Sequence, residues 1–188
     1  MPRIIAGEAR GIPLVTPQGE KTRPTSDKAK EALFSILMPR LHNSCFLDIY
    51  AGSGQIGLEA VSRGADQAVL IEQAGPAIKA IQQNIEKTRL GDRVLLMRGS
   101  ALSCLRQLID NKKKFDLIYL DPPWEQAVQD FVKLSELLAE LLDEHGMIIL
   151  EHESRNSPDD HVTKLKCLRH CQYGAAMLSF YHLNIEDH

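Results

Sequence analysis

The tetrad Asp121–Trp124, Asp-Pro-Pro-Trp, follows a short apolar run and has the composition needed to handle an aromatic amine. A carboxylate and a backbone carbonyl held close together can accept hydrogen bonds from an exocyclic base amine, whose lone pair is otherwise delocalised into its ring. The two prolines fix φ and restrict the residues before them, so these acceptors are held in place. Trp124 offers a face for stacking an unpaired base. An isolated tetrad of this kind also fits a strand end beside a core tryptophan.

A second candidate site is the segment Leu47–Gly57, LDIYAGSGQIG, which contains the pattern G-x-G-x-x-G. Between a strand and a helix, this pattern is typical of loops that bind a nucleotide-type cofactor. Glu72 follows the first glycine, Gly52, by 20 residues and is placed to accept hydrogen bonds from ribose hydroxyls. The pattern and Glu72 fit both NAD and S-adenosylmethionine.

Asp48 favours one of these two cofactors. It precedes the first glycine by four residues, so its carboxylate is expected near the phosphate site of a dinucleotide, where like charges repel. The same carboxylate suits a cofactor without phosphates that carries an ammonium and a sulfonium group, as S-adenosylmethionine does. A purely structural alternative is that Asp48 caps the following helix.

The elements expected to position these residues alternate between strands and helices. Amphipathic stretches around Ile78–Ile85 and Val128–Leu142 separate the apolar runs, and the second stretch is predicted to stop near Gly146. This order predicts an α/β fold with a doubly wound, mostly parallel sheet, ending in an antiparallel hairpin over Cys167–Tyr173 and Met177–Leu183. The predicted buried strands are Cys45–Ile49, Ala68–Glu72, Val94–Met97, Phe115–Asp121 and Met147–Glu151.

Residues 1–40 differ from the remainder of the chain. They are predicted to form a small hairpin over Arg3–Val15 and an amphipathic helix over Ser26–Met38. They contain seven Lys/Arg against four Asp/Glu, whereas the whole chain has a net charge of −3. We therefore predict an N-terminal extension, residues 1–40, that faces a phosphate-bearing partner, and a catalytic domain, residues 41–188.

The composition is that of a globular protein, with 188 residues, 44% hydrophobic and 25% charged. No run is long enough to cross a bilayer and no secretory signal is recognisable, so a cytoplasmic protein is expected. The four cysteines are too scattered for a disulfide framework. Cys167 and Cys171 flank His170, but the spacing C-x-x-x-C is wrong for a zinc knuckle, and we predict no metal site.

With these motifs in place, the chain resembles the bacterial family of small-subunit (16S) ribosomal RNA guanine 2-amino methyltransferases. The glycine loop and the tetrad occur in many amino-methyltransferases, whereas RPTSDKAKEALFSIL at Arg23–Leu37 is much more particular to this family. The other matching segments are RIIAGEARG at Arg3–Gly11, LDIYAGSGQIGLEAVSRGA at Leu47–Ala65, IE at Ile71-Glu72, DPPW at Asp121–Trp124 and YGAAMLSFYH at Tyr173–His182.

The resemblance implies a class I methyltransferase fold of Rossmann-like type, S-adenosylmethionine as the methyl donor, and a guanine 2-amino group of 16S ribosomal RNA as the acceptor. It also implies a monomer that acts on RNA, alone or in an assembling small subunit. The residues that it assigns to the cofactor are Asp48, Ala51, Gly52, Ser53, Gly54, Glu72 and Ser100. Those that it assigns to catalysis are Asp121, Pro122, Pro123 and Trp124. The candidates for RNA contact are Arg3, Arg10, Arg23, Thr25 and Lys28.

Two residues depart from the family pattern. Ser100 stands where such enzymes usually carry Asp or Asn to accept from the adenine amine, although a hydroxyl can still accept that bond. Trp124 replaces the commoner Phe or Tyr, so the base pocket must be wider.

Three other functions remain as alternatives. A DNA adenine or cytosine amino-methyltransferase shares the tetrad chemistry, and only the Arg23–Leu37 segment and the short chain argue against it. An NAD-dependent oxidoreductase conflicts with Asp48 beside a pyrophosphate and lacks a Tyr-x-x-x-Lys pair. A catalytically silent RNA-binding module is the third.

Overall fold

The computed structural model describes residues 2–17 and 27–184. The chain divides into two compact units, Met1–Ala101 and Leu102–His188. The boundary between these compact units differs from the predicted boundary at residue 40. The predicted boundary divides the chain by function and not by packing, and it stays a prediction.

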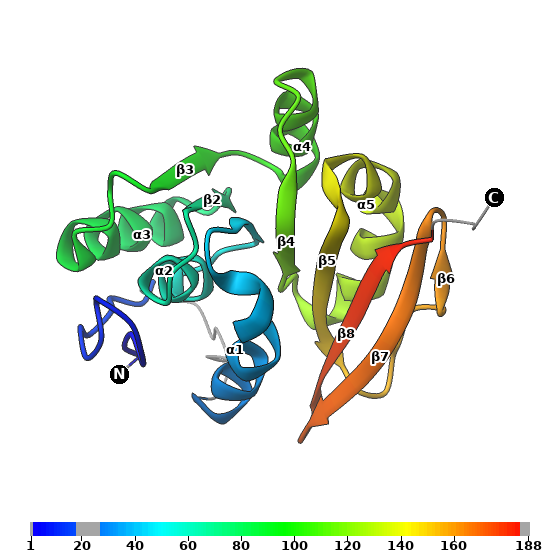
Figure 1. Cartoon of the computed structure of the whole chain (residues 1–188), viewed down its shortest axis with the longest axis horizontal. Helices are drawn as coiled ribbons and strands as arrows, with labels where there is room; N and C mark the ends of the chain where they lie inside the picture. The colour runs from blue at the N-terminus through cyan, green and yellow to red at the C-terminus, as the bar shows by residue number, and fades with distance from the viewer. Residues whose placement is uncertain (1, 18–26, 185–188) are drawn as a thin grey trace. The chain divides into compact units, whose positions relative to one another are not determined.

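The described residues of the first unit form three parallel strands in the order β3-β2-β1, with helices between them (Figure 1). All eight residues of α2 are buried, as expected for a helix covered on every side. Pro76 lies in the first turn of α3, where its missing N–H costs nothing, and Arg89 ends that helix in a left-handed conformation. The elements are α1 (Asp27–Leu41), β1 (Cys45–Ile49), α2 (Gln55–Ser62), β2 (Gln67–Glu72), α3 (Gly75–Thr88) and β3 (Val94–Arg98).

The N-terminal segment forms the predicted hairpin. Arg3 and Pro13 make an antiparallel bridge, and the Ile4 N–H donates to the Ile12 carbonyl at 3.0 Å. The Ile4 and Leu14 side chains are buried, which gives the hairpin an apolar anchor in the first unit. The hairpin is therefore part of this unit's core and not a loose arm.

The second unit begins in α4, and as far as Asn184 it contains five strands in the order β4-β5-β8-β7-β6 (Figure 1). β4 and β5 are parallel, and the pairs β5–β8, β8–β7 and β7–β6 are antiparallel. Phe131 of α5 packs on Tyr181 with ring centroids 4.7 Å apart. The elements are α4 (Ala101–Asp110), β4 (Phe115–Leu120), the short 3₁₀ helix η1 (Trp124–Gln126), α5 (Ala127–Leu141), β5 (Leu142–Glu153), β6 (His161–Val162), β7 (Leu165–Tyr173) and β8 (Ala176–Leu183).

The predicted α/β class, with parallel strands followed by an antiparallel C-terminal hairpin, is confirmed. The prediction for the end of the helix in the second unit was wrong. α5 ends at Leu141, and Leu142 already has the extended conformation of β5. Gly146 lies in an irregular stretch of β5. Phe115 of β4 pairs with Leu142, but Leu117, two residues later, pairs with Met147, so the register shifts between them. Gly146 is therefore part of a β-bulge and does not end the helix.

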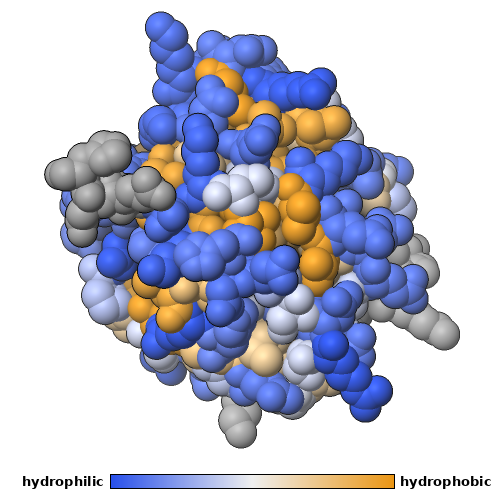
Figure 2. All heavy atoms as spheres, turned by 90° about the vertical axis from the view of Figure 1, so that its right-hand side faces the viewer, coloured by the Kyte–Doolittle hydropathy of each residue, from blue (hydrophilic) through white to orange (hydrophobic). Residues whose placement is uncertain are grey.

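Hydrophobic and hydrophilic side chains are interspersed on the face shown in Figure 2. Among the described residues of the second unit, the large exposed apolar side chains are Val132, 48% exposed, and Leu168, 53% exposed. Within the ranges 2–17 and 27–184, no helix has the length and apolar character needed to span a membrane.

Candidate active-site residues

The loop after β1 turns through left-handed backbone conformations. The φ angles are +64° at Tyr50, +56° at Gly52 and +76° at Gly54. Two backbone bonds hold it: the Ala51 N–H donates to the Ile71 carbonyl at 3.1 Å, and the Gly54 N–H donates to the Ala51 carbonyl at 2.7 Å. The loop is therefore fixed against the end of β2, which carries Glu72.

The three glycines of the pattern fall into two kinds, Gly54 and Gly57 on one side and Gly52 on the other. A Cβ on Gly54 would lie 2.9 Å from Leu70 Cδ2, and one on Gly57 would lie 2.7 Å from Leu70 Cδ1, so both allow the loop and α2 to pack closely on β2. Among the residues that the structure describes, none would lie within 4 Å of a Cβ on Gly52. Packing inside the protein does not require glycine there, and the space beside it is open to a ligand.

Asp48 lies at the penultimate position of β1 and is 1% exposed. Its Oδ2 accepts a hydrogen bond from the Gly57 N–H at 2.8 Å, so the helix-capping role considered as an alternative is present. Burial raises the pKa of Asp48 to about 7, with a smaller rise from Glu72, while the bond from Gly57 lowers it. A cationic ligand bound beside Asp48 would stabilise its carboxylate, because a nearby positive charge favours the ionised form of a buried carboxyl group.

Glu72 closes the loop from the end of β2. Its Oε2 accepts from the Gly52 N–H at 2.9 Å, and its Oε1 accepts from the N–H groups of Gln73 and Ala74, both at 2.8 Å. A carboxylate has about four lone-pair sites, so these three bonds leave capacity for a further donor such as a ribose hydroxyl.

Ser100 follows β3 and directly precedes α4. Its side chain is exposed, and the neighbouring Gly99 N–H donates to the Glu72 carbonyl at 3.0 Å. This bond ties the segment that carries Ser100 to the end of β2, so the two predicted cofactor residues stand on adjacent strand ends.

Asn84 is a residue of this region that the sequence reasoning missed. It lies on α3 and is fully buried. Its Nδ2 donates to the carbonyls of Val15 and Ser53 at 2.9 and 2.8 Å, and its Oδ1 accepts from the Val15 N–H at 2.7 Å. Asn84 therefore joins the N-terminal segment to the glycine loop. The signal was a polar residue on the face of α3 that otherwise carries Ile81.

Glu59 of α2 anchors the start of the chain in a similar way. Its carboxylate is fully buried and accepts from the N–H groups of Ile5 and Ala6 at 2.8 and 3.0 Å. Arg63 and Lys30 lie within 2.7 and 3.6 Å of the same carboxylate. Two cations and two backbone donors compensate the buried charge, which fixes the N-terminal hairpin on α2.

The tetrad lies at the carboxyl end of β4, as predicted, and the strand ends one residue before it. Asp121 and Trp124 are half-buried, Pro122 is buried and Pro123 is exposed. Pro123 has φ −52° and ψ 128°, and its carbonyl accepts from the Gln126 N–H at 2.9 Å to start η1. Two residues before Asp121, the hydroxyl of Tyr119 donates to Glu151 of β5, so the ends of the two strands are also held together.

The predicted RNA-facing residues are described in part. Arg3 and Arg10 are exposed on the N-terminal hairpin. Lys28 falls in α1, but its side chain lies outside the described set, as do Arg23 and Thr25.

A glycine loop after β1, an acidic residue at the end of β2 and an Asp-Pro-Pro-aromatic tetrad after β4 define a Rossmann-like methyltransferase fold. The same fold is found in a ribosomal protein L11 methylase from Lactobacillus delbrueckii subsp. bulgaricus, with a TM-score of 0.62 at 17% identity over 82% of this chain and 77% of that one. The likeness to that methylase concerns the fold alone.

The chain belongs to the family described as Conserved hypothetical protein 95, whose model matches residues 2–182. It is 38% identical over 132 residues to the Ribosomal RNA small subunit methyltransferase D of Haemophilus influenzae, covering 67% of this chain and 68% of that protein. A solved structure of a hypothetical protein from Thermus thermophilus superposes with a TM-score of 0.84 and 28% identity, over 97% of this chain and all of that one.

Proposed function

We propose that this protein transfers a methyl group from S-adenosylmethionine to the exocyclic 2-amino group of a guanine in 16S ribosomal RNA. The observation that carries this proposal is the proline-locked tetrad at the end of β4, with Asp121 and Trp124 half-buried. The reaction belongs where ribosomes are assembled, in the cytoplasm, and we propose that a monomer carries it out.

The residues of the first unit fit the cofactor. S-adenosylmethionine supplies an electrophilic methyl group on a sulfonium. Asp48, with its pKa raised by burial, can balance a positive charge at the methionine end, and Glu72 retains acceptor capacity for ribose hydroxyls. Gly52 leaves open space through which the loop backbone can approach a ligand.

The tetrad residues would act on the amine. In the transfer, the amine nitrogen would form a bond to the methyl carbon as the bond from that carbon to sulfur breaks, and the nitrogen would release one proton to solvent. Asp121 would accept a hydrogen bond from the amine, which localises the nitrogen lone pair and stabilises the positive charge that develops there. Trp124 would stack on the guanine, while the prolines keep Asp121 in place.

Ribosomal RNA as substrate is supported by the name of the Haemophilus relative and by the exposed Arg3 and Arg10 on the hairpin. If these residues meet phosphates, RNA affinity falls steeply with salt because counterions are released on binding. Arg3→Gln with Arg10→Gln is expected to flatten the plot of log affinity against log salt concentration. An unchanged slope contradicts the docking role of the hairpin.

The experiment that tests the proposal is methyl transfer from labelled S-adenosylmethionine to small-subunit RNA and to partly assembled particles from cells lacking this protein. The RNA is digested and the labelled nucleoside is identified by mass spectrometry, with Asp121→Ala alongside. Asp110, exposed at the end of α4, provides a matched control as Asp110→Ala.

Label in 2-methylamino guanosine that is lost in Asp121→Ala and kept in Asp110→Ala supports the proposal. Label in another base refutes the guanine target and favours the alternative of adenine or cytosine methylation, for which DNA is tested in parallel. Tight cofactor binding without label on any nucleic acid refutes catalysis on nucleic acid altogether.

A further inference from the structure

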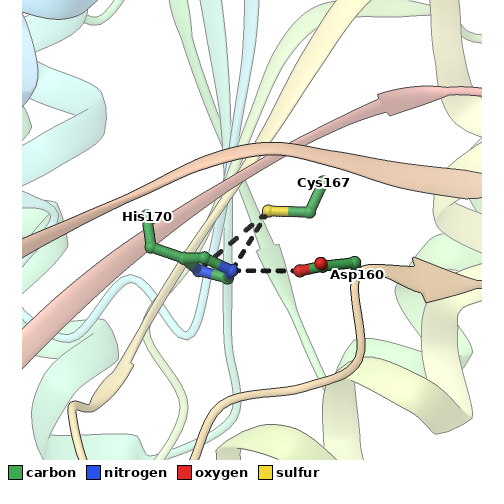
Figure 3. A group of neighbouring side chains, drawn as sticks. All are labelled: Asp160, Cys167 and His170. Carbon is green, nitrogen blue, oxygen red and sulfur yellow. Dashed lines mark hydrogen bonds and ion pairs between the residues drawn. The ribbon is translucent and has the colours of Figure 1, made fainter.

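Three side chains with metal-ligating atoms converge at the edge of the second unit, in a region that the proposed methyl transfer does not use. Asp160 directly precedes β6, and Cys167 and His170 belong to β7. His170 Nε2 lies 3.3 Å from Asp160 Oδ1 and 3.5 Å from Cys167 Sγ, and the three ligand atoms all lie within 4.8 Å of one another. Figure 3 shows the imidazole of His170 turned toward both partners.

A β-bulge brings Cys167 and His170 together. In a regular strand, residues three positions apart point to opposite faces of the sheet. The register between β7 and β8 shifts between Cys167 and Arg169, so the strand gains one residue there and the two side chains reach one face. Asp160 is held beside them because the Cys167 N–H donates to its carbonyl at 2.7 Å.

A buried hydrogen-bond chain sets the proton on the His170 ring. His152 Nδ1 lies 2.9 Å from the Glu153 carbonyl, which only accepts, so Nδ1 carries a proton. Burial lowers the pKa of His152, which keeps it neutral and leaves Nε2 to accept from the Ser179 hydroxyl at 2.6 Å. The Ser179 oxygen then accepts from His170 Nδ1, also at 2.6 Å.

The consequence concerns the other nitrogen of His170. With one proton held on Nδ1, Nε2 is the ring atom that faces Cys167 and Asp160, and its lone pair is available to a metal once Nε2 gives up the proton that it otherwise shares with Asp160. A metal-ligating histidine usually donates its second ring N–H to an oxygen in this way, which fixes its tautomer and orientation. The Ser179 hydroxyl, fully buried, is an oxygen of this kind.

The spacing also matches the coordination geometry of zinc. Tetrahedral zinc with ordinary bond lengths separates a nitrogen and a sulfur ligand by about 3.6 Å, and a nitrogen and a carboxylate oxygen by about 3.4 Å. The observed separations are 3.5 and 3.3 Å. The Asp160 side chain is 74% exposed, so it can turn to bring its oxygen closer to the sulfur.

We propose that Asp160, Cys167 and His170 form a zinc-binding site, with a fourth position filled by water. The prediction of no metal from the sequence considered only Cys167, His170 and Cys171. Asp160 precedes Cys167 by seven residues and is not part of that motif, and Cys171 is not a member of the cluster. Bound zinc links the start of β6 to the middle of β7 and thereby stabilises the edge of the sheet.

Cobalt(II) provides the direct test because it reports both ligand type and geometry. The full chain, freed of any affinity tag and treated with a chelator, is titrated with cobalt and then with zinc. We expect one equivalent to give a thiolate-to-cobalt charge-transfer absorption and the visible bands of tetrahedral cobalt, both removed by zinc. Zinc should also raise the melting temperature of the chain.

The variants separate residues that ligate the metal from residues that only neighbour it. Cys167→Ser and His170→Asn should each weaken cobalt binding by more than about 100-fold, and Ser179→Ala by about 10- to 100-fold. Cys171→Ser is the matched control on the same strand and should bind cobalt normally. Circular dichroism and binding of S-adenosylhomocysteine establish that each variant is folded.

Charge-transfer absorption that disappears in Cys167→Ser and persists in Cys171→Ser supports the site. Absorption that survives Cys167→Ser, or no cobalt bound to the folded wild-type chain, overturns the proposal and leaves the three residues as a hydrogen-bonded cluster. These readouts do not involve methyl transfer, so they are independent of the proposed function.

Discussion

The glycine loop of the first unit and the tetrad of the second are both located at strand ends, but they are held by different means. In the loop, Asp48 and Glu72 accept hydrogen bonds from backbone N–H groups, and the backbone has positive φ angles at Gly52 and Gly54. In the tetrad, proline rings restrict the backbone covalently. Hydrogen-bonded carboxylates respond to pH and ligand charge, whereas prolines do not. The stability and the cofactor affinity of the glycine-loop region are thus expected to vary with pH, whereas the backbone of the tetrad is expected to be rigid.

Asp121→Ala gives the largest expected effect and separates the two regions. Because Asp121 belongs to the tetrad, we expect kcat to fall about 100- to 1000-fold while the affinity for S-adenosylhomocysteine is unchanged. Single-turnover methyl transfer and calorimetric titration measure the two quantities. A parallel loss of cofactor affinity would show that the regions do not act separately.

Asp48→Asn tests whether the stability of the glycine-loop region depends on pH. The folded-state pKa of Asp48, about 7, lies above its ordinary value of 3.8, so ionisation opposes folding increasingly as the pH rises from about 4 to about 7. Asparagine can still accept from Gly57 without this cost. We expect the variant to be more stable than the wild type above pH 7, by on the order of 2–4 kcal/mol, and equally stable near pH 4.

The same variant should bind the cofactor poorly. A cationic ligand favours ionised Asp48, so wild-type affinity should rise with pH up to about 7, whereas the variant should show no such rise. Denaturant unfolding and cofactor titration across this pH range provide the measurement. A pH-independent difference in stability would contradict the assignment of the buried proton to Asp48.

Gly52→Ala should have a smaller effect, and Gly174→Ala is its matched control. Both glycines have positive φ, +56° and +65°, and a Cβ at either meets no atom of residues 2–17 or 27–184 within 4 Å. Each substitution should therefore cost about 1–2 kcal/mol of stability. Only Gly52→Ala should also weaken cofactor binding, by about tenfold or more, which corresponds to about 1.4 kcal/mol. Equal affinities in the two variants would place the cofactor elsewhere.

Pro123→Ala is expected to have the smallest effect. Releasing φ at this exposed position restores backbone freedom worth about 0.4–1 kcal/mol, so kcat should fall about two- to fivefold at every pH. Methyl-transfer rates between about pH 6 and pH 9 test this. A loss of rate that varies with pH would mean that the backbone of the tetrad too is held in place by a titrating group.

The sequence was most informative where a feature is local. Strands such as Cys45–Ile49 were predicted because continuous apolar runs of this length are buried on both faces. The glycine spacing likewise located the loop. The end of α5 was misplaced because Gly146 serves a bulge, and strand register depends on pairing with β4, which the sequence does not display.

Features that depend on tertiary packing or on strand register were not predictable. Asn84 reads as an ordinary polar residue of a helix, and its bonds to Val15 and Ser53 exist only once three segments have packed. The cluster of Asp160 with Cys167 and His170 needs a bulge that shifts one residue of β7. Neither arrangement follows from periodicity or spacing.

The bonds of Asn84 have a consequence for how binding events communicate. One side-chain amide holds both the hairpin that carries Arg3 and Arg10 and the loop expected to cradle the cofactor. If RNA shifts the hairpin, the loop must adjust, and the affinity for the cofactor changes. Because coupling between two binding sites is reciprocal, the cofactor must then change the affinity for RNA by the same factor. Loading of the methyl donor and docking on RNA are thus expected to be linked equilibria and not independent events.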